Sequence, residues 1–306
     1  MKIAFVWKWW SGKSTISALF TKHLFQKNLP VIWFDADINI NYFQNMNIEI
    51  KPELALSNSE NMKQIRNFLI WENEKIKSPA YFVKTTPPGS WSNFLEYRKD
   101  NFIIKNFAQQ VQGNYFMYIG TYNDDWIWTS CYHNHLSIFE NVLSHTKLQQ
   151  KEYLVADMSA GTDAFSNTLH AQFHKIVLII NPSSESIKVA NDFIRLANKA
   201  WTSENINIII NNFEDPQEAE VIEQSIWIKA TAYLKKNKKI QQKSLLWEEI
   251  NIADTNYQEE FDKILNSPAK YKEDDIYQNL RNLHLKYANQ DHVIKKVGDI
   301  SLQAKT

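Results

Sequence analysis

Residues 2–37 read KIAFVWKWWSGKSTISALFTKHLFQKNLPVIWFDAD, and this stretch decides the fold. The run at 2–7 is short and apolar, which is typical of a buried strand. Residues 13–27 carry apolar side chains three and four positions apart, the spacing of one helix face. The second apolar run, at 31–37, predicts another buried strand. A strand, a helix and a strand in this order form a βαβ unit, which predicts a parallel sheet with both faces covered.

The same alternation returns later in the chain. Strand-like apolar runs lie at 115–120, 152–157, 175–180 and 205–210, and a helical pattern fills 184–200. We therefore predict an α/β fold with a doubly wound, mostly parallel sheet. In such sheets ligands bind outside the carboxyl ends of the strands, so we expect the functional site there.

Other segments are less regular. We predict a strand at 81–86, a helix at 163–173 and a last sheet strand at 226–234. The chain beyond that strand is polar and helix-like. The interpretation is a sheet domain over 1–235 followed by a helical C-terminal appendage over 236–306.

The composition narrows the classes of partner. Lys and Arg number 34, and so do Asp and Glu, which gives a net charge of zero and no global attraction to nucleic acid or anionic membrane. A single cysteine excludes a disulfide within the chain. No run of 18 apolar residues occurs, so we expect no membrane span and a cytoplasmic protein. Glycine is unusually rare, with 6 copies, whereas tryptophan has 11.

The link between the first strand and the first helix carries a candidate phosphate-binding motif. Residues 8–15 read KWWSGKST, so Gly12, Lys13 and Ser14 lie where a helix begins. In a phosphate loop the lysine reaches the β- and γ-phosphates, the following hydroxyl ligates Mg²⁺, and backbone N–H groups take other phosphate oxygens. The four residues GKST are a weak signal alone, but their place between a strand and an amphipathic helix strengthens it.

Three motifs in order resemble the MinD/ParA class of P-loop ATPases. They are residues 8–15, Asp35-Ala36-Asp37 at the end of the second strand, and DMSAGTD at 157–163. That class carries a deviant Walker A motif, KGGxGKST. The resemblance covers roughly residues 1–212 and implies a P-loop NTPase fold. Within the class, the stretches 129–133 and 157–173 are most similar to the nickel-insertion accessory ATPases of carbon monoxide dehydrogenase.

The resemblance implies roles for the residues of the phosphate loop. Lys13 would hold the β- and γ-phosphates, Ser14 would ligate Mg²⁺, and Thr15 would contact the α-phosphate. Ser11 and Gly12 would contribute to the nucleotide cradle. Lys8 matches the signature lysine, which in the class reaches the nucleotide across a dimer interface.

The resemblance also implies roles at the ends of the later strands. Asp37 matches the acidic residue that positions the attacking water, and Asp157 matches the Walker B carboxylate behind the metal, with Asp35 beside it. Asn211 matches the asparagine that recognises adenine. The implied activity is Mg²⁺-dependent hydrolysis of ATP by a homodimer that serves a client protein, which could be a metalloenzyme.

The chain departs from the class at three loop positions. Trp7, Trp9 and Trp10 stand where the class has glycine. Glycine permits positive φ angles that cost other residues about 1–2 kcal/mol each, and it lets the backbone approach phosphate closely. We therefore expect weakened or abolished nucleotide binding in this chain, and the placement of these tryptophans favours deliberate substitution over drift.

Three alternatives follow from these features. The loop tryptophans favour a non-catalytic scaffold that keeps the fold, and the class as a whole includes partitioning and positioning ATPases. Cys131, His133 and His135 alternate, so on an extended segment they would share a face and could form a transition-metal site with a symmetry mate. The other interpretation of Cys131 is a small buried hydrophobic residue.

Overall fold

The computed structural model describes residues 1–7, 12–37, 46–121, 132–158, 165, 168–246 and 248–305, without the side chains of 132–134. Within these residues eight strands form one sheet, in the order β3-β4-β2-β5-β1-β6-β7-β8. The strands are β1 (Lys2–Val6), β2 (Val31–Ala36), β3 (Gln109–Val111), β4 (Asn114–Tyr118), β5 (Tyr153–Met158), β6 (Lys175–Ile180), β7 (Ile206–Phe213) and β8 (Ala232–Lys235). Every neighbouring pair is parallel except β3 and β4, which are antiparallel at one edge. The predicted doubly wound sheet is confirmed.

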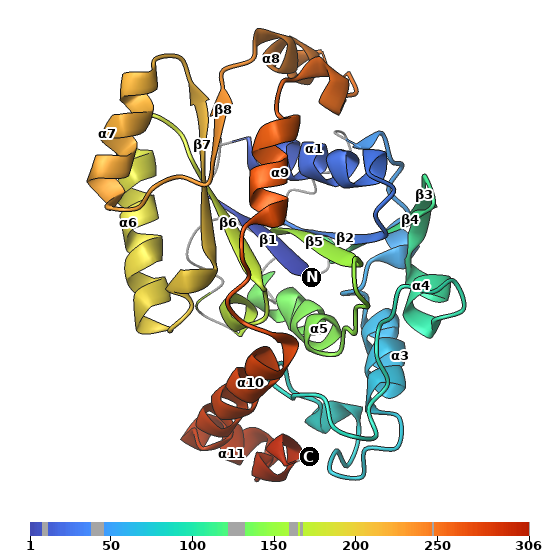
Figure 1. Ribbon diagram of the computed structural model, residues 1–306. Helices are drawn as coiled ribbons and strands as arrows, with labels where there is room; N and C mark the ends of the chain where they lie inside the picture. Colours follow the sequence, from blue (N-terminus) through green and yellow to red (C-terminus); the bar gives the residue numbers. More distant parts are fainter. Residues whose placement is uncertain are drawn as a thin grey trace.

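Helices lie on both faces of this sheet. The helices of the described residues are α1 (Lys13–Gln26), α3 (Ser59–Ile70), α4 (Phe102–Phe107), α5 (Tyr132–Ser144), α6 (Ser184–Lys199), α7 (Pro216–Ile226), α8 (Lys238–Leu245), α9 (Gln258–Asn266), α10 (Glu273–Ala288) and α11 (Asp291–Val297). Figure 1 shows α1 and α9 on one side of the central strands and α5 on the other. The connections from β1 to β2 and from β6 to β7 run toward opposite edges, so right-handed crossovers place α1 and α6 on opposite faces.

The strand order reverses at β1, which lies in the middle of the sheet between β5 and β6. All five residues of β1 and all six of β6 are buried, as expected of parallel strands covered on both faces. Aromatic packing continues this core into α1, where Phe5 and Phe20 lie with ring centroids 5.2 Å apart. The crevice at a reversal of strand order is the usual ligand site of such sheets, so the fold itself points to the carboxyl end of β1.

The C-terminal helical region is present, and its helix α9 packs against α1. Phe261 of α9 meets Phe20 of α1 edge to face at 5.6 Å, and His23 Nε2 lies 2.7 Å from Asp262 Oδ1. Further along, the buried Lys2 Nζ forms an ion pair of 2.6 Å with Glu273 of α10. No described helix is both long enough and apolar enough to cross a bilayer.

Three local predictions were wrong or misplaced. Residues 81–86 form turns instead of a strand, because Thr85 and Thr86 direct their hydroxyls to His284 (2.9 Å) and Gln303 (2.8 Å) of the C-terminal region. Of the predicted helix at 163–173, the described part contains only a short 3₁₀ turn at Leu169–Ala171. The last strand is confined to Ala232–Lys235, since α7 extends through Ile226.

Candidate functional site

Gly12 marks the start of the site, at the N-terminus of α1. Its φ of 77° lies in the left-handed region, and its carbonyl oxygen accepts the first hydrogen bond of the helix from the N–H of Ile16 at 2.9 Å. A Cβ at this position would lie 3.5 Å from Asn211 Nδ2, an ordinary contact. The backbone angle, more than the available space, is therefore what requires glycine here. Lys8 and Ser11 lie outside the described residues.

Lys13, the first residue of α1, turns its amine toward the ends of two strands. Its Nζ donates to Asp37 Oδ2 at 2.7 Å and to the carbonyl oxygen of Met158, and it lies 3.3 Å from Asp157 Oδ1. Burial alone would lower the pKa of Lys13, but the charges of Asp157 and Asp37 outweigh it and raise the pKa. The lysine therefore remains a cation although it is almost fully buried.

Three carboxyl groups converge on that one cation. Asp35, Asp37 and Asp157 follow or end β2 and β5, and all three are buried. Burial raises the pKa of Asp35 well above its usual value, and the nearby charge of Asp157 adds to the shift. Burial likewise raises the pKa of Asp157, against the opposing effect of Lys13. We call Lys13, Asp35, Asp37 and Asp157 the strand-end cluster; it has fewer positive than negative groups.

The strand-end cluster offers ligands of the kind that Mg²⁺ prefers, namely hydroxyl and carboxylate oxygens. Ser14 Oγ donates to Asp157 Oδ2 at 2.6 Å, so these two oxygens already lie together. The other oxygen of Asp157, Oδ1, is fully buried and has no hydrogen bond, only the ion-pair contact with Lys13. Asp35 stays close through its Oδ1, which accepts from the N–H of Asp37 at 3.0 Å. Ser14 and Asp157 therefore bring together a hydroxyl and a carboxylate oxygen of the kind that a divalent cation takes as ligands.

A pocket of about 520 Å³ adjoins the N-terminus of α1. Its lining comes from the start of α1, from the carboxyl ends of β6 and β7, from α8 and the residue before it, and from the segment before α9. The residues are Gly12, Thr15, Ile16, Asn181, Asn211, Asn212, Asn237, Ile240, Gln241, Ser244, Leu245 and Tyr257. Asn211 Nδ2 donates to Asn181 Oδ1 at 3.3 Å, which ties the ends of β6 and β7 together. The wall thus combines amides with apolar side chains, a composition suited to a planar heterocycle.

The sequence interpretation missed the part of this wall that follows residue 235. Asn237 is the signal that could have revealed it, because it stands directly before a helical pattern. Its Oδ1 accepts from the N–H groups of Lys239 (2.9 Å) and Ile240 (3.2 Å), and so caps α8 beside the pocket. Its Nδ2 donates to the carbonyl oxygen of Asp254 at 3.0 Å.

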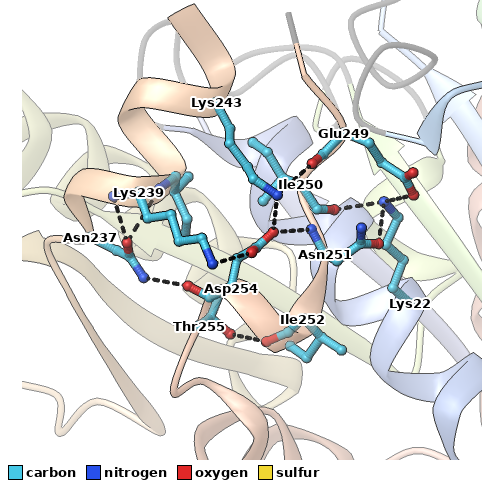
Figure 2. A network of polar contacts seen from close by, with 11 residues as sticks. Lys22, Asn237, Lys239, Lys243, Glu249, Ile250, Asn251, Ile252, Asp254 and Thr255 are labelled. Carbon is cyan, nitrogen blue, oxygen red and sulfur yellow. Dashed lines mark hydrogen bonds and ion pairs between the residues drawn. The ribbon is translucent and has the colours of Figure 1, made fainter. Parts of the chain in front are cut away.

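Ion pairs fasten α8 to the segment that follows it (Figure 2). Asp254 contacts Lys239 Nζ at 2.7 Å and Lys243 Nζ at 2.6 Å, and we call these three residues the Asp254 cluster. From α1, Lys22 Nζ reaches across to Glu249 Oε1 at 2.9 Å and to the carbonyl oxygen of Ile250 at 2.6 Å. The wall formed by α8 is therefore tied indirectly to the same helix that begins at Lys13.

The predicted Cys/His arrangement falls mostly outside the described residues. Cys131 is outside them, as is the side chain of His133. The backbone from 132 onward is helical, as α5, and within it His135 is buried. Burial lowers the pKa of His135, which favours the neutral imidazole. Within the described part of the chain, no three His, Cys, Asp or Glu side chains are grouped so that they alone could hold a metal ion, and this holds for the strand-end cluster too.

Comparisons with known proteins agree with this geometry. No protein-family model matches the chain. Two uncharacterised ATP-binding proteins of Methanocaldococcus jannaschii are similar: one is 24% identical over 82% of this chain and 94% of its own length, the other 23% identical over 89% and 99%. The crystal structure of a ParA family ATPase from Chlorobium tepidum superposes with a TM-score of 0.56 at 15% identity, over 98% of each chain. The chain therefore has the fold of ParA-type P-loop ATPases.

Proposed function

We propose that the chain is an ATP-binding protein of the ParA/MinD kind that hydrolyses ATP in a Mg²⁺-dependent reaction. The observation that carries the proposal is the meeting of Lys13, Ser14 and three carboxylates at the N-terminus of α1, next to the pocket lined by Asn211. A helix N-terminus with a buried lysine is suited to phosphate oxygens, and the adjoining pocket is suited to a base. The names of the two Methanocaldococcus relatives support the same ligand.

Each residue of the strand-end cluster would have a separate task. Lys13 would leave its carboxylate partners for the β- and γ-phosphates, and Ser14, Asp35 and Asp157 would hold Mg²⁺. Bound Mg²⁺ would supply charge neutralisation at the phosphate oxygens. Asp37 would orient the attacking water once Lys13 has turned away from it. Thr15 would meet the α-phosphate and Asn211 the adenine.

The binding energy must offset the contacts that Lys13 already makes. Its amine is engaged by two carboxylates and one carbonyl oxygen. With Mg²⁺-ATP bound, Lys13 would exchange its carboxylate partners for phosphate oxygens, and Asp35 and Asp157, as the residues that would hold Mg²⁺, would again face a positive charge. We therefore expect ATP and Mg²⁺ to bind together much more tightly than either alone.

The quaternary state and the physiological role extend this proposal. We propose a homodimer in which Lys8 of one protomer reaches the nucleotide of its partner, in the cytoplasm, with a client protein. A role in metallocentre maturation would use Cys131 and His133 at the dimer interface. Capture of a metalloenzyme by the ATP-bound chain would support that role, whereas capture of DNA would favour a partitioning ATPase.

One observation favours a different function. Trp7 is buried at the end of β1, and Trp9 and Trp10 stand in the phosphate-loop motif. Indoles at glycine positions obstruct the approach of phosphate to the backbone, so the chain as printed could act as a nucleotide-free scaffold. On that hypothesis the fold and its partner surface are kept while the chemistry is lost.

Titration calorimetry with Mg²⁺-ATP separates the two functions. We would compare this chain, the variant Trp7→Gly/Trp9→Gly/Trp10→Gly, and the same variant with Lys13→Gln as a matched control. Binding by the glycine variant that is lost with Lys13→Gln supports the ATPase, and binding by the unaltered chain would show that the tryptophans do not obstruct the loop. Absence of binding in every form, with folded protein, would favour the scaffold.

A further inference from the structure

Three tryptophans of the described chain adopt backbone angles that belong to glycine. The φ angles are 47° at Trp71, 60° at Trp201 and 58° at Trp227. Asparagine enters this region with some ease, but for a bulky side chain it is a true outlier. The three indoles also gain little from burial, since their exposed fractions are 62%, 83% and 90%. Each position therefore has the backbone of a glycine and a side chain that packs against little.

The hydrogen bonds around Trp201 define the role of that position. The N–H of Thr202 donates to the carbonyl oxygen of Ala197 at 2.9 Å. The N–H of Trp201 donates to the carbonyl oxygen of Asn198 at 3.3 Å. This pair of bonds is the Schellman motif, which ends a helix with one left-handed residue. Trp201 is that residue at the end of α6. Glycine is the usual occupant because it has no Cβ.

The other two helix ends make the same demand. Trp227 follows α7 with φ 58° and ψ 27°, the left-handed angles of a helix stop. Trp71 follows α3 with φ 47° and ψ −115°, and the N–H of Asn73 donates to the carbonyl oxygen of Ile70 at 2.9 Å. These angles have the opposite signs to those of the first central residue in a type II turn. Trp71 therefore occupies the first central position of a type II′ turn, where glycine is usual.

An independent observation comes from the phosphate loop. Trp7, Trp9 and Trp10 stand where the KGGxGKST pattern and its preceding residue need glycine for phosphate to approach the backbone. The composition matches both sets of positions, since the chain has 6 glycines and 11 tryptophans, whereas glycine alone usually makes up about 7% of residues. Glycine is scarce, and tryptophan is abundant where glycine is needed.

We propose that the working protein carries glycine at positions 7, 9, 10, 71, 201 and 227, through a UGA codon that its host decodes as glycine. UGA is a stop codon in most genomes, but some bacterial lineages decode it as tryptophan and others as glycine. A gene that uses UGA for glycine therefore reads as tryptophan at those codons under the other code. Random replacement of glycine would not insert one residue type, the bulkiest, at helix ends and phosphate loop alike.

The inference changes what the site can do. With glycine at positions 7, 9 and 10, the loop regains the full KGGxGKST pattern, and the obstruction that favoured a scaffold disappears. This half of the inference rests on the proposed function. The half at positions 71, 201 and 227 does not, because it follows from backbone angles at helix ends, none of which lines the pocket.

The direct test examines the gene and the native protein. We expect UGA codons at the six positions, and tandem mass spectrometry of peptides from the host-made chain should show glycine at each of them. UGG codons at these positions, or indole-containing residues in the native peptides, would overturn the proposal. Both measurements are independent of any nucleotide activity.

A recombinant test separates glycine from mere removal of an indole. Trp201→Gly and Trp227→Gly should each raise the folding equilibrium constant by roughly tenfold over the matched variants Trp201→Ala and Trp227→Ala, because alanine keeps the Cβ. Equal stability of the glycine and alanine variants would contradict the backbone argument. If the glycine variants are stabilised and native peptides contain glycine, but the loop variant binds no Mg²⁺-ATP, the decoding proposal stands and the proposed function fails.

Discussion

The molecule has two groups of charged side chains beside one pocket, and they are built on opposite principles. In the strand-end cluster, one lysine faces three carboxylates in a dry setting, and burial raises the pKa of Asp35 and of Asp157. In the Asp254 cluster, two lysines face one carboxylate near the surface, and their hydrogen bonds hold the pKa of Asp254 far below its usual range. The first cluster has more carboxylates than lysines, and the second has more lysines than carboxylates.

This difference in charge balance indicates which cluster is suited to bind a ligand and which one stabilises the pocket wall. A buried excess of carboxylate is costly in the free protein and becomes favourable when a cation arrives, so it is suited to a ligand site. A carboxylate surrounded by its own cations has nothing left to bind. The Asp254 cluster therefore holds the α8 wall of the pocket in place, as Figure 2 shows.

Lys13→Met should have the largest effect, because it removes the one cation among three buried carboxylates. We expect a loss of about 3–5 kcal/mol in the free energy of unfolding at pH 7, measured by urea denaturation. In the Trp7→Gly/Trp9→Gly/Trp10→Gly background, Mg²⁺-ATP affinity should fall at least ~100-fold. The matched control is Lys22→Met, a buried lysine of the same helix that should leave ATP affinity within a few-fold. Equal losses of affinity in both variants would contradict the comparison.

Asp254→Asn should come second, with a loss of about 1–2 kcal/mol at pH 7. Because the pKa of Asp254 is lowered in the folded state, its stabilisation is present above about pH 4, the unfolded value, and is lost as pH falls below it. The difference between variant and parent should therefore shrink in acid. Asp192→Asn, which breaks an exposed ion pair with Arg195, serves as the control and should change stability by less than ~0.5 kcal/mol.

Asp35→Asn should have the opposite sign, a gain of about 1 kcal/mol at neutral pH, because it removes a desolvated charge. A raised folded pKa means that the parent loses stability as pH rises above about 4, and the variant should lose this slope. Glu140→Gln offers a reference, since burial raises the pKa of Glu140 to about 7. The stability that Glu140 makes pH-dependent should therefore be lost between about pH 4.5 and 7. A destabilised Asp35→Asn protein would show that the cluster is balanced after all.

Lys239→Gln should have the smallest effect. The lysine side chain is 59% exposed, and Lys243 still contacts Asp254 in its absence. We expect a loss below ~0.5 kcal/mol that disappears in high salt, as for other exposed ion pairs. Thermal unfolding at low and high ionic strength measures it. A large loss that is insensitive to salt would mean that the Asp254 cluster is not a surface fastening.

Local pattern was sufficient for the parts of the chain whose burial is uniform. The apolar run of β1, the helical spacing of α1 and the Asp35-Ala36-Asp37 strand end all lie where the pattern predicted them. The run at 81–86 misled because its threonines are held by the distant residues His284 and Gln303, a contact that no local period records. Hydrophobic alternation indicates burial and cannot identify the partner.

The sequence by itself determined that Lys13, Ser14, Asp35, Asp37 and Asp157 stand at strand and helix ends, because parallel strands place their carboxyl ends along one edge. Only the tertiary structure decided that Lys13 is shared among carboxylates, that Asn237 and α8 complete the pocket wall, and that Trp71, Trp201 and Trp227 occupy glycine angles. The physical reason is the same in each case. Charge balance, pocket walls and the sign of φ arise from contacts between segments far apart in the chain or from backbone angles, and neither is written in the spacing of residue types.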